Sequence, residues 1–193
     1  MRNFPEPDIA IFIHENCVDP KESIYRFTDN TRREREEIIK WISIYGRIPE
    51  IEYIYPALNQ YLGDYTFDCG KLSESLTSYF KNYRMQKLTN CIYPEFLEQV
   101  YANAKSLPYT HLETRDSAIL RIEDKKSAFL DWIDALGVEY LPYITALARK
   151  KGLSMHVDIA YSQLPTITSI NRGFYDNRRG SLKKEKNQDL DDI

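Results

Sequence analysis

The sequence predicts an α/β protein, α+β overall, in which a mostly helical N-terminal region precedes a single βαβ unit. Through about the first 110 residues, apolar side chains recur at helical spacing. Near residue 125 the pattern changes to a short apolar run, a helical stretch and an alternating stretch. We therefore expect a helical region at 1–125, the start of an α/β core at 126–176 and a polar tail at 177–193.

Composition excludes several classes of protein. A length of 193 residues suits roughly one domain, and the formal net charge of −3 argues against a generally basic nucleic-acid binder. The three cysteines are far apart and form no CxxC pair, which argues against a disulfide scaffold and a structural zinc site. No apolar run approaches the about 18 residues of a membrane helix, and no signal-peptide core is present. We expect a cytoplasmic protein with no membrane partner.

The first elements are short. Residues 8–14 form an apolar run of strand length, and we predict a strand there, although periodicity alone does not separate strand from helix. Pro20 marks a break, and residues 22–28 predict a short helix.

A longer helix is predicted to follow. Thr31 and Glu34 have the spacing of a capping box, which satisfies two free amide donors at a helix start. One apolar face then continues to Tyr45, and Gly46 is placed to end the helix.

Three more apolar faces at helical spacing complete the region: 51–62, 72–83 and 96–104. Pro56 should interrupt the first of them. We interpret these aromatic stripes as core packing, since no catalytic constellation accompanies them.

The α/β part begins with an apolar strand at 127–133, of the kind buried on both faces. A helix over 138–150 and an alternating, half-buried strand over 154–159 follow. Such a βαβ unit is expected to be parallel and right-handed. A further helix is predicted over 168–174, and the polar tail beyond Asp176 is expected to be disordered on its own.

Three residues in this part could carry chemistry. Asp134 directly follows the first strand, where ligands bind in parallel α/β sheets, and a carboxylate there can hold a metal ion. Thr166 and Thr168 follow the second strand, where a hydroxyl at a helix N-terminus can bind phosphate or form an alkoxide. Spacing alone favours ordinary capping roles for all three residues.

Two short motifs carry a family resemblance. Ile133–Glu139 (Ile-Asp-Ala-Leu-Gly-Val-Glu) and Leu164–Ser169 (Leu-Pro-Thr-Ile-Thr-Ser) resemble the start of a PglZ domain. PglZ domains belong to the alkaline phosphatase superfamily and occur in BREX-type phage-defence systems of bacteria and archaea. Residues 27–39 also resemble the helical region that often precedes such a domain. The resemblance implies that the βαβ unit opens an alkaline-phosphatase-like α/β/α core.

The resemblance also implies a function. The chain would be part of a metal-dependent phosphatase or phosphodiesterase acting in antiviral defence, with other proteins of the system as partners. Asp134 matches the position of a ligand for a divalent metal, usually zinc. Thr168 matches the nucleophile or substrate-contacting hydroxyl, which the metal would also bind, and Thr166 is the second choice.

The chain departs from the family pattern downstream. A complete site needs further Asp and His ligands from later strands, and no histidine follows His156. We therefore expect a fragment that is catalytically inactive by itself, and enzyme activity stays open. The alternative is a non-catalytic protein-interaction module of a defence complex.

Overall fold

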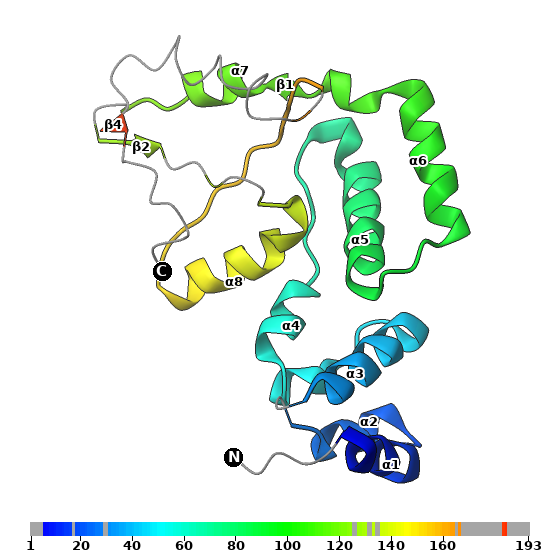
Figure 1. Cartoon of the computed structure of the whole chain (residues 1–193). Coiled ribbons are helices and arrows are strands. Elements are labelled where there is room, and N and C mark those ends of the chain that lie inside the picture. The colour runs from blue at the N-terminus through cyan, green and yellow to red at the C-terminus, as the bar shows by residue number, and fades with distance from the viewer. Residues whose placement is uncertain are drawn as a thin grey trace. The chain divides into compact units, whose positions relative to one another are not determined.

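A computed structural model describes most of the chain. The described residues are 6–16, 18–28, 31–124, 127–130, 133, 136–164, 166 and 183–184. Helices predominate and strands are few (Figure 1), which confirms the helix-rich α/β class in its coarse form. No helix in the described ranges is both long and apolar enough to cross a membrane.

The chain divides into two compact units. The helical unit comprises Met1–Thr66, Ser75–Val100 and Gly137–Met155. The strand-bearing unit comprises Phe67–Glu74, Tyr101–Leu136 and His156–Ile193. The predicted boundaries after residues 125 and 176 stay predictions.

The first element is a helix, α1 (Glu6–Asn16), so the predicted strand over 8–14 is wrong. A proline in the first turn suits a helix, because its missing N–H would have no partner there. Pro7 occupies that turn. The helix packs against α3 and brings Ile13 onto the core. An apolar run this short fits either structure, and tertiary packing decides between them.

The next helices follow the sequence prediction. The short helix near 22–28 is present as α2 (Pro20–Ser23) and the 3-10 turn η1 (Ile24–Arg26). The helix α3 (Arg32–Tyr45) begins with the predicted capping box. At its other end, Gly46 has a φ of 74°, a left-handed conformation that glycine adopts without steric cost.

The break at Pro56 is also confirmed, since η2 (Pro49–Tyr53) ends before it and α4 (Pro56–Tyr61) begins with it. These elements enclose one cluster of buried apolar side chains. Its members are Ile24, Phe27, Ile38, Trp41, Ile42, Ile48, Ile51 and Leu62.

Two longer helices, α5 (Ser73–Thr89) and α6 (Pro94–Ser106), match the remaining predicted faces. They meet through aromatic side chains, with the ring centroids of Tyr79 and Phe96 5.3 Å apart. The predicted helix over 138–150 is present as η5 (Val138–Tyr140) and α8 (Leu141–Lys150). It packs against α4 within the helical unit (Figure 1).

The strand-bearing unit contains short elements: η3 (Gly70–Leu72), η4 (Pro108–His111), β1 (Glu113–Thr114), α7 (Arg115–Leu120), β2 (Phe129–Leu130), β3 (Ala160–Tyr161) and β4 (Lys183–Lys184). The strands form two parallel pairs, β1 with β3 and β2 with β4.

This pairing corrects the predicted βαβ unit. The described part of 127–133 does contain a strand, β2, but residues 154–159 form none, and the next strand is β3. β2 and β3 lie in different pairs rather than side by side. Alternation predicts only which side chains share a face, whereas a strand also needs a hydrogen-bonding partner.

The end of the chain is described only in part. The predicted helix over 168–174 lies outside the described residues. In the tail, which was expected to lack structure, Lys183 and Lys184 form strand β4.

Candidate functional site

The structure describes one of the three predicted site residues, Thr166. Asp134 and Thr168 lie outside the described residues. Thr166 is exposed and belongs to neither a helix nor a strand. Each position follows a strand in the sequence. β2 ends at Leu130, before Asp134, and β3 ends at Tyr161, before Thr166.

The zinc implied by the resemblance finds no ligand set among the residues that the structure describes. Nowhere in those ranges do three or more His, Cys, Asp or Glu side chains gather so that they could hold a metal ion. Asp134 itself falls outside the described residues, and its role as a metal ligand stays a prediction.

Acidic side chains do meet around Arg121 in the strand-bearing unit. The guanidinium contacts both carboxylate oxygens of Glu113, at 2.6 and 2.9 Å, and lies 3.0 Å from Oδ1 of Asp158. Nε2 of His156 lies 3.3 Å from the same Asp158 oxygen. Since Arg121 neutralises these carboxylates, we interpret the cluster as a salt-bridge network that ties β1 to the segment before β3.

A second charged pair joins α5 to η5, the 3-10 turn directly before α8. Nζ of Lys87 donates to Oε1 of Glu139 at 2.5 Å, across 52 residues of sequence. Only 2% of the Glu139 side chain is exposed, against 53% for Lys87. A buried carboxylate is costly unless it is paired, so Lys87 stabilises the position of Glu139.

Gly137 makes room for this pair. A Cβ atom at this position would collide with the carboxylate of Glu139. That carboxylate is the far end of a flexible side chain, so a larger residue at position 137 would require it to shift from its place beside Lys87. The Gly-x-Glu spacing in the motif Ala-Leu-Gly-Val-Glu therefore has a packing reason.

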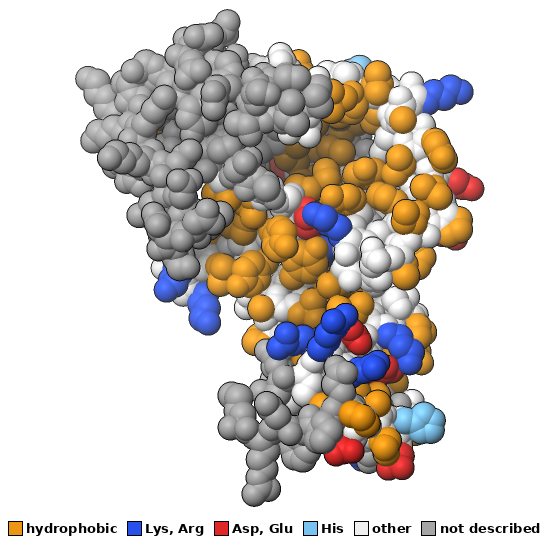
Figure 2. Space-filling model, viewed as in Figure 1, with side chains coloured by type: hydrophobic (Ala, Val, Ile, Leu, Met, Phe, Trp, Pro, Cys, Tyr) orange, Lys and Arg blue, Asp and Glu red, His pale blue; other side chains and the backbone are white. Residues whose placement is uncertain are grey.

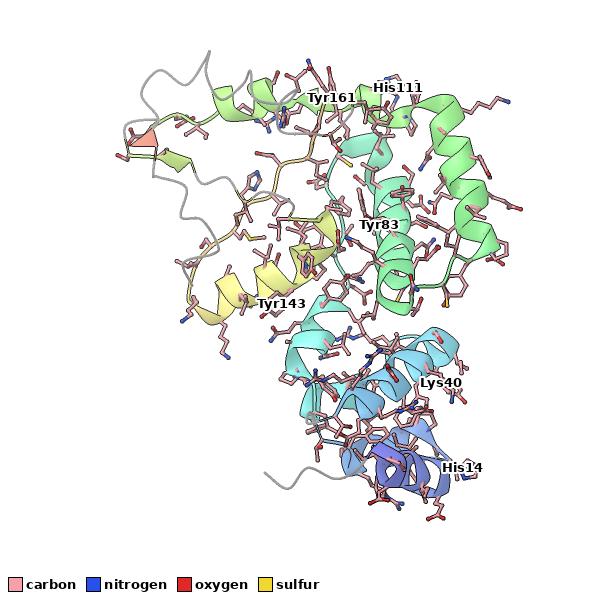
Figure 3. The ribbon with its side chains drawn as sticks, in the orientation of Figure 1. His14, Lys40, Tyr83, His111, Tyr143 and Tyr161 are labelled. Carbon is pink, nitrogen blue, oxygen red and sulfur yellow. The ribbon has the colours of Figure 1, made fainter. Side chains whose placement is uncertain are left out.

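Aromatic side chains surround the pair. The rings of Tyr61 on α4 and Tyr140 on η5 meet edge to face, with centroids 5.3 Å apart. These residues line an open hollow of about 450 Å³ on the helical unit. Its lining also includes Ala57, Leu58, Lys87, Leu88, Glu139 and Tyr143. Figure 3 labels Tyr143 on α8.

Burial and nearby charges in the hollow shift the pKa values of two side chains, Tyr61 and Lys87. Burial, reinforced by the charge of Glu139, raises the pKa of Tyr61 to about 12. The hydrogen bond to Glu139, together with its negative charge, raises the pKa of Lys87. Tyr61 thus stays a neutral phenol and Lys87 a cation at physiological pH.

A buried arginine, Arg84, binds backbone carbonyl groups at the end of α4. Arg84 on α5 is 5% exposed and donates to the backbone oxygens of Gly63 and Leu62, at 2.8 and 3.3 Å. These carbonyls lie at the C-terminal end of α4, where a cation is favourable. Burial lowers the pKa of Arg84, and the nearby Tyr61 and Asp64 oppose that shift.

Sequence reasoning missed Lys87, Glu139 and Arg84. A weak signal existed for Glu139, because it is the only charged residue between Gly137 and Arg149, in a stretch that is otherwise mostly apolar. Lys87 and Arg84 gave no signal, since isolated cations on a helix are usually solvated.

The comparisons with known proteins add one match. A family model described as a domain of unknown function (DUF7863) matches residues 1–45, which contain α1 to α3. No curated protein matches the chain. No solved structure matches it either.

Proposed function

We propose that this chain supplies the opening part of a PglZ-like, metal-dependent phosphatase or phosphodiesterase that acts in phage defence. The observation that supports this most is the order of the two motifs along β2, α8 and β3. The first motif, 133–139, lies between β2 and α8, and the second, 164–169, follows β3. In open parallel α/β sheets, ligands bind beyond the carboxyl ends of the strands.

The two motifs would have different roles. The carboxylate of Asp134 would bind a divalent metal, zinc by preference, as an oxygen ligand. The hydroxyl of Thr168 would lose its proton and attack phosphorus as the P–O bond to the departing alcohol breaks, and water would then release the phosphate from Thr168. Thr166 is the second choice for that role. When bound, the metal would supply charge neutralisation at the phosphate and a lowered pKa for the attacking hydroxyl.

The test is hydrolysis by the full-length product of the encoding gene, loaded with zinc or manganese. An aryl phosphate monoester and an aryl phosphodiester serve as generic substrates. We expect metal-dependent turnover, abolished by a chelator and lowered at least about 100-fold in Asp134→Ala and in Thr168→Ala. The 193-residue chain assayed alone should be inactive.

A matched control is available at Asp64. Its side chain is 77% exposed and pairs loosely with Lys81 at 3.6 Å, so Asp64→Ala should keep full turnover. Absence of turnover in a folded, metal-loaded protein would overturn the proposal. Turnover that survives both Asp134→Ala and Thr168→Ala would overturn the residue assignments.

A second candidate is a non-catalytic interaction module within a defence complex. It is favoured by large apolar side chains that stay exposed on the helical unit, among them Ile44 (61%), Tyr53 (77%) and Ile92 (71%). Figure 2 shows many hydrophobic side chains on the visible face. Exposed apolar groups of this size are frequent at protein interfaces. Under either candidate, the proposed partners are other defence proteins in the cytoplasm.

The second candidate would be supported if the folded, metal-loaded protein has no hydrolytic activity and co-purifies with another defence protein. Activity lost in Asp134→Ala would support the first.

A further inference from the structure

The hollow on the helical unit has the size and the lining of a small-molecule site. Its volume of about 450 Å³ is typical of ligand pockets, and all of its lining residues belong to that one unit. Ala57, Leu58 and Leu88 give it apolar surface, and three tyrosines add aromatic rings. One charged pair, Lys87 with Glu139, lies among them. A largely apolar lining with a few polar groups is the usual form of a binding pocket.

The charges of this pair select an uncharged ligand. The carboxylate of Glu139 disfavours an anion, and the ammonium of Lys87 disfavours a cation. Lys87 donates to one carboxylate oxygen, Oε1, and the described residues donate no hydrogen bond to the other, Oε2. An ammonium has three N–H groups, so Lys87 keeps donor capacity beyond the bond to Glu139. The pair therefore presents a donor and an acceptor side by side, with no net charge.

The aromatic rings favour a planar ligand. Tyr140 meets Tyr61 edge to face and is still 43% exposed, so part of its ring surface is available for stacking. Contacts outside the hollow hold the lining in place. The guanidinium of Arg84 lies 5.9 Å from the ring centroid of Tyr61, and Nζ of Lys87 lies 5.7 Å from that of Tyr83. A site that is ordered before binding loses less entropy when the ligand arrives.

We propose that this hollow binds a neutral, planar heterocycle whose edge carries a carbonyl group beside N–H groups, and that guanine is the nucleobase that fits it. The base is read by hydrogen bonds along its edge and by stacking on an aromatic ring. O6 of guanine accepts from Lys87, N1–H and the 2-amino group donate to the carboxylate of Glu139, and the ring stacks on Tyr140. The inference does not depend on the proposed phosphatase activity.

The order of donors and acceptors distinguishes guanine from the other common bases. Its edge has one acceptor followed by two donors, and a carboxylate can accept two neighbouring N–H groups, as it does from arginine. Uracil has one N–H group between two carbonyl groups, cytosine has two acceptors and one donor, and adenine has no carbonyl group. Each of them would leave part of the Lys87–Glu139 pair without a partner, which is costly at a buried carboxylate.

The experiment titrates the 193-residue chain with nucleosides and follows its backbone amide resonances by NMR. Guanosine is the probe, and 1-methylguanosine keeps the ring and the 2-amino group but lacks N1–H. We expect guanosine to bind with a Kd on the order of 100 µM and to shift resonances of 57–61, 87–88 and 138–143. 1-Methylguanosine should bind at least about tenfold more weakly, because a methyl group replaces a donor to the buried carboxylate. Tetramethylammonium, a probe for an organic-cation site, should not bind.

Variants locate the site. Tyr140→Leu removes the stacking surface, and Glu139→Gln removes one of the two acceptor oxygens. Each should lower the affinity for guanosine at least about tenfold. Tyr53→Leu is the matched control, because Tyr53 is a 77% exposed tyrosine of the same unit that does not line the hollow, and its affinity should equal that of the parent. Circular dichroism checks that each variant is folded.

Absence of guanosine binding to the parent chain at millimolar concentration would overturn the proposal. Equal affinity for 1-methylguanosine would overturn recognition of the edge, and this result needs no variant to fold. Binding of tetramethylammonium in preference to guanosine would overturn the choice of an uncharged ligand. Unchanged affinity in a folded Tyr140→Leu would overturn the location. None of these readouts uses a metal or hydrolysis, so they are separate from the tests of the proposed function.

Discussion

The helical and strand-bearing units differ in where their stabilising contacts come from. In the helical unit, residues 24–62 alone supply a cluster of buried apolar side chains, including Trp41 and Ile42. In the strand-bearing unit, each described strand has two residues and pairs with only one other described strand. A pair of such strands has too little buried surface to be stable by itself.

This difference teaches that the two units depend on their surroundings to different degrees. The helical unit carries its own core, and we expect it to set the stability of the chain. The strand-bearing unit has the short strands expected of a sheet that needs further strands beside it. Four measurements test this comparison, beginning with the largest expected effect.

Trp41→Ala should cause the largest loss of stability. Trp41 is 4% exposed and its ring packs on Phe27, with centroids 5.0 Å apart. Truncation of a buried aromatic side chain costs about 3–5 kcal/mol of unfolding free energy. Urea denaturation followed by circular dichroism measures it. Ile44→Ala is the control, since Ile44 lies on the same helix and is 61% exposed; equal losses would contradict a core in this region.

Glu34→Ala should cause the next largest loss of stability. Glu34 is 6% exposed and accepts hydrogen bonds from the backbone N–H groups of Thr28 and Thr31, at 2.7 and 3.2 Å. Both hydroxyls also donate to its carboxylate. Loss of this cap should lower the unfolding free energy by about 2 kcal/mol. Glu36→Ala, at an exposed pair on the same helix, should cost less than about 0.5 kcal/mol. A cost for Glu34→Ala as small as that of the control would show that the cap is not formed.

Alkaline pH should weaken the helical unit. The phenol of Tyr61 ionises near pH 10 when unfolded and near 12 when folded, so only the unfolded state gains charge between these values. Stability should be fully present below pH 10 and fall as the pH rises toward 12, by at most about 1.4 kcal/mol per pH unit because partial exposure screens the effect. Deprotonation of Lys87, whose pKa is also raised, acts in the same direction. Denaturation midpoints of the parent and Tyr61→Phe at pH 9 and 11 check this, and equal slopes would contradict it.

Arg121→Ala should have the smallest effect. The guanidinium joins Glu113 to Asp158, but all three side chains are partly exposed. The global unfolding midpoint should stay unchanged, while backbone exchange at Glu113–Thr114 and Ala160–Tyr161 becomes faster. High salt should produce the same acceleration in the parent, because it screens exposed charges. A large drop in the midpoint would show that the strand-bearing unit contributes to global stability.

The sequence predicts the helices well where their signals are local. The cap formed by Thr31 and Glu34, the helix end at Gly46 and the interruption at Pro56 each follow from a few neighbouring residues, and the structure confirms them. The errors at 8–14 and 154–159 have one cause. An apolar or alternating run specifies a face, and the partner that covers the face lies far away in sequence.

In the candidate site too, local signals can be read from the sequence and long-range contacts cannot. A motif can name Asp134, Thr166 and Thr168, whose roles stay predictions. The pair of Lys87 and Glu139 could not be predicted, because it joins positions 52 residues apart, on α5 and on η5. Long-range ion pairs leave no periodic pattern in a sequence.

The most direct test of the central claim is zinc binding by the full-length gene product, since it needs no knowledge of the substrate. The metal-free protein is titrated with zinc, beside Asp134→Asn and the exposed control Asp64→Asn. We predict at least one tightly bound zinc per chain, with an affinity at least about tenfold lower in Asp134→Asn and unchanged in Asp64→Asn. Equal zinc affinity in all three proteins would contradict the assignment of Asp134 as a metal ligand.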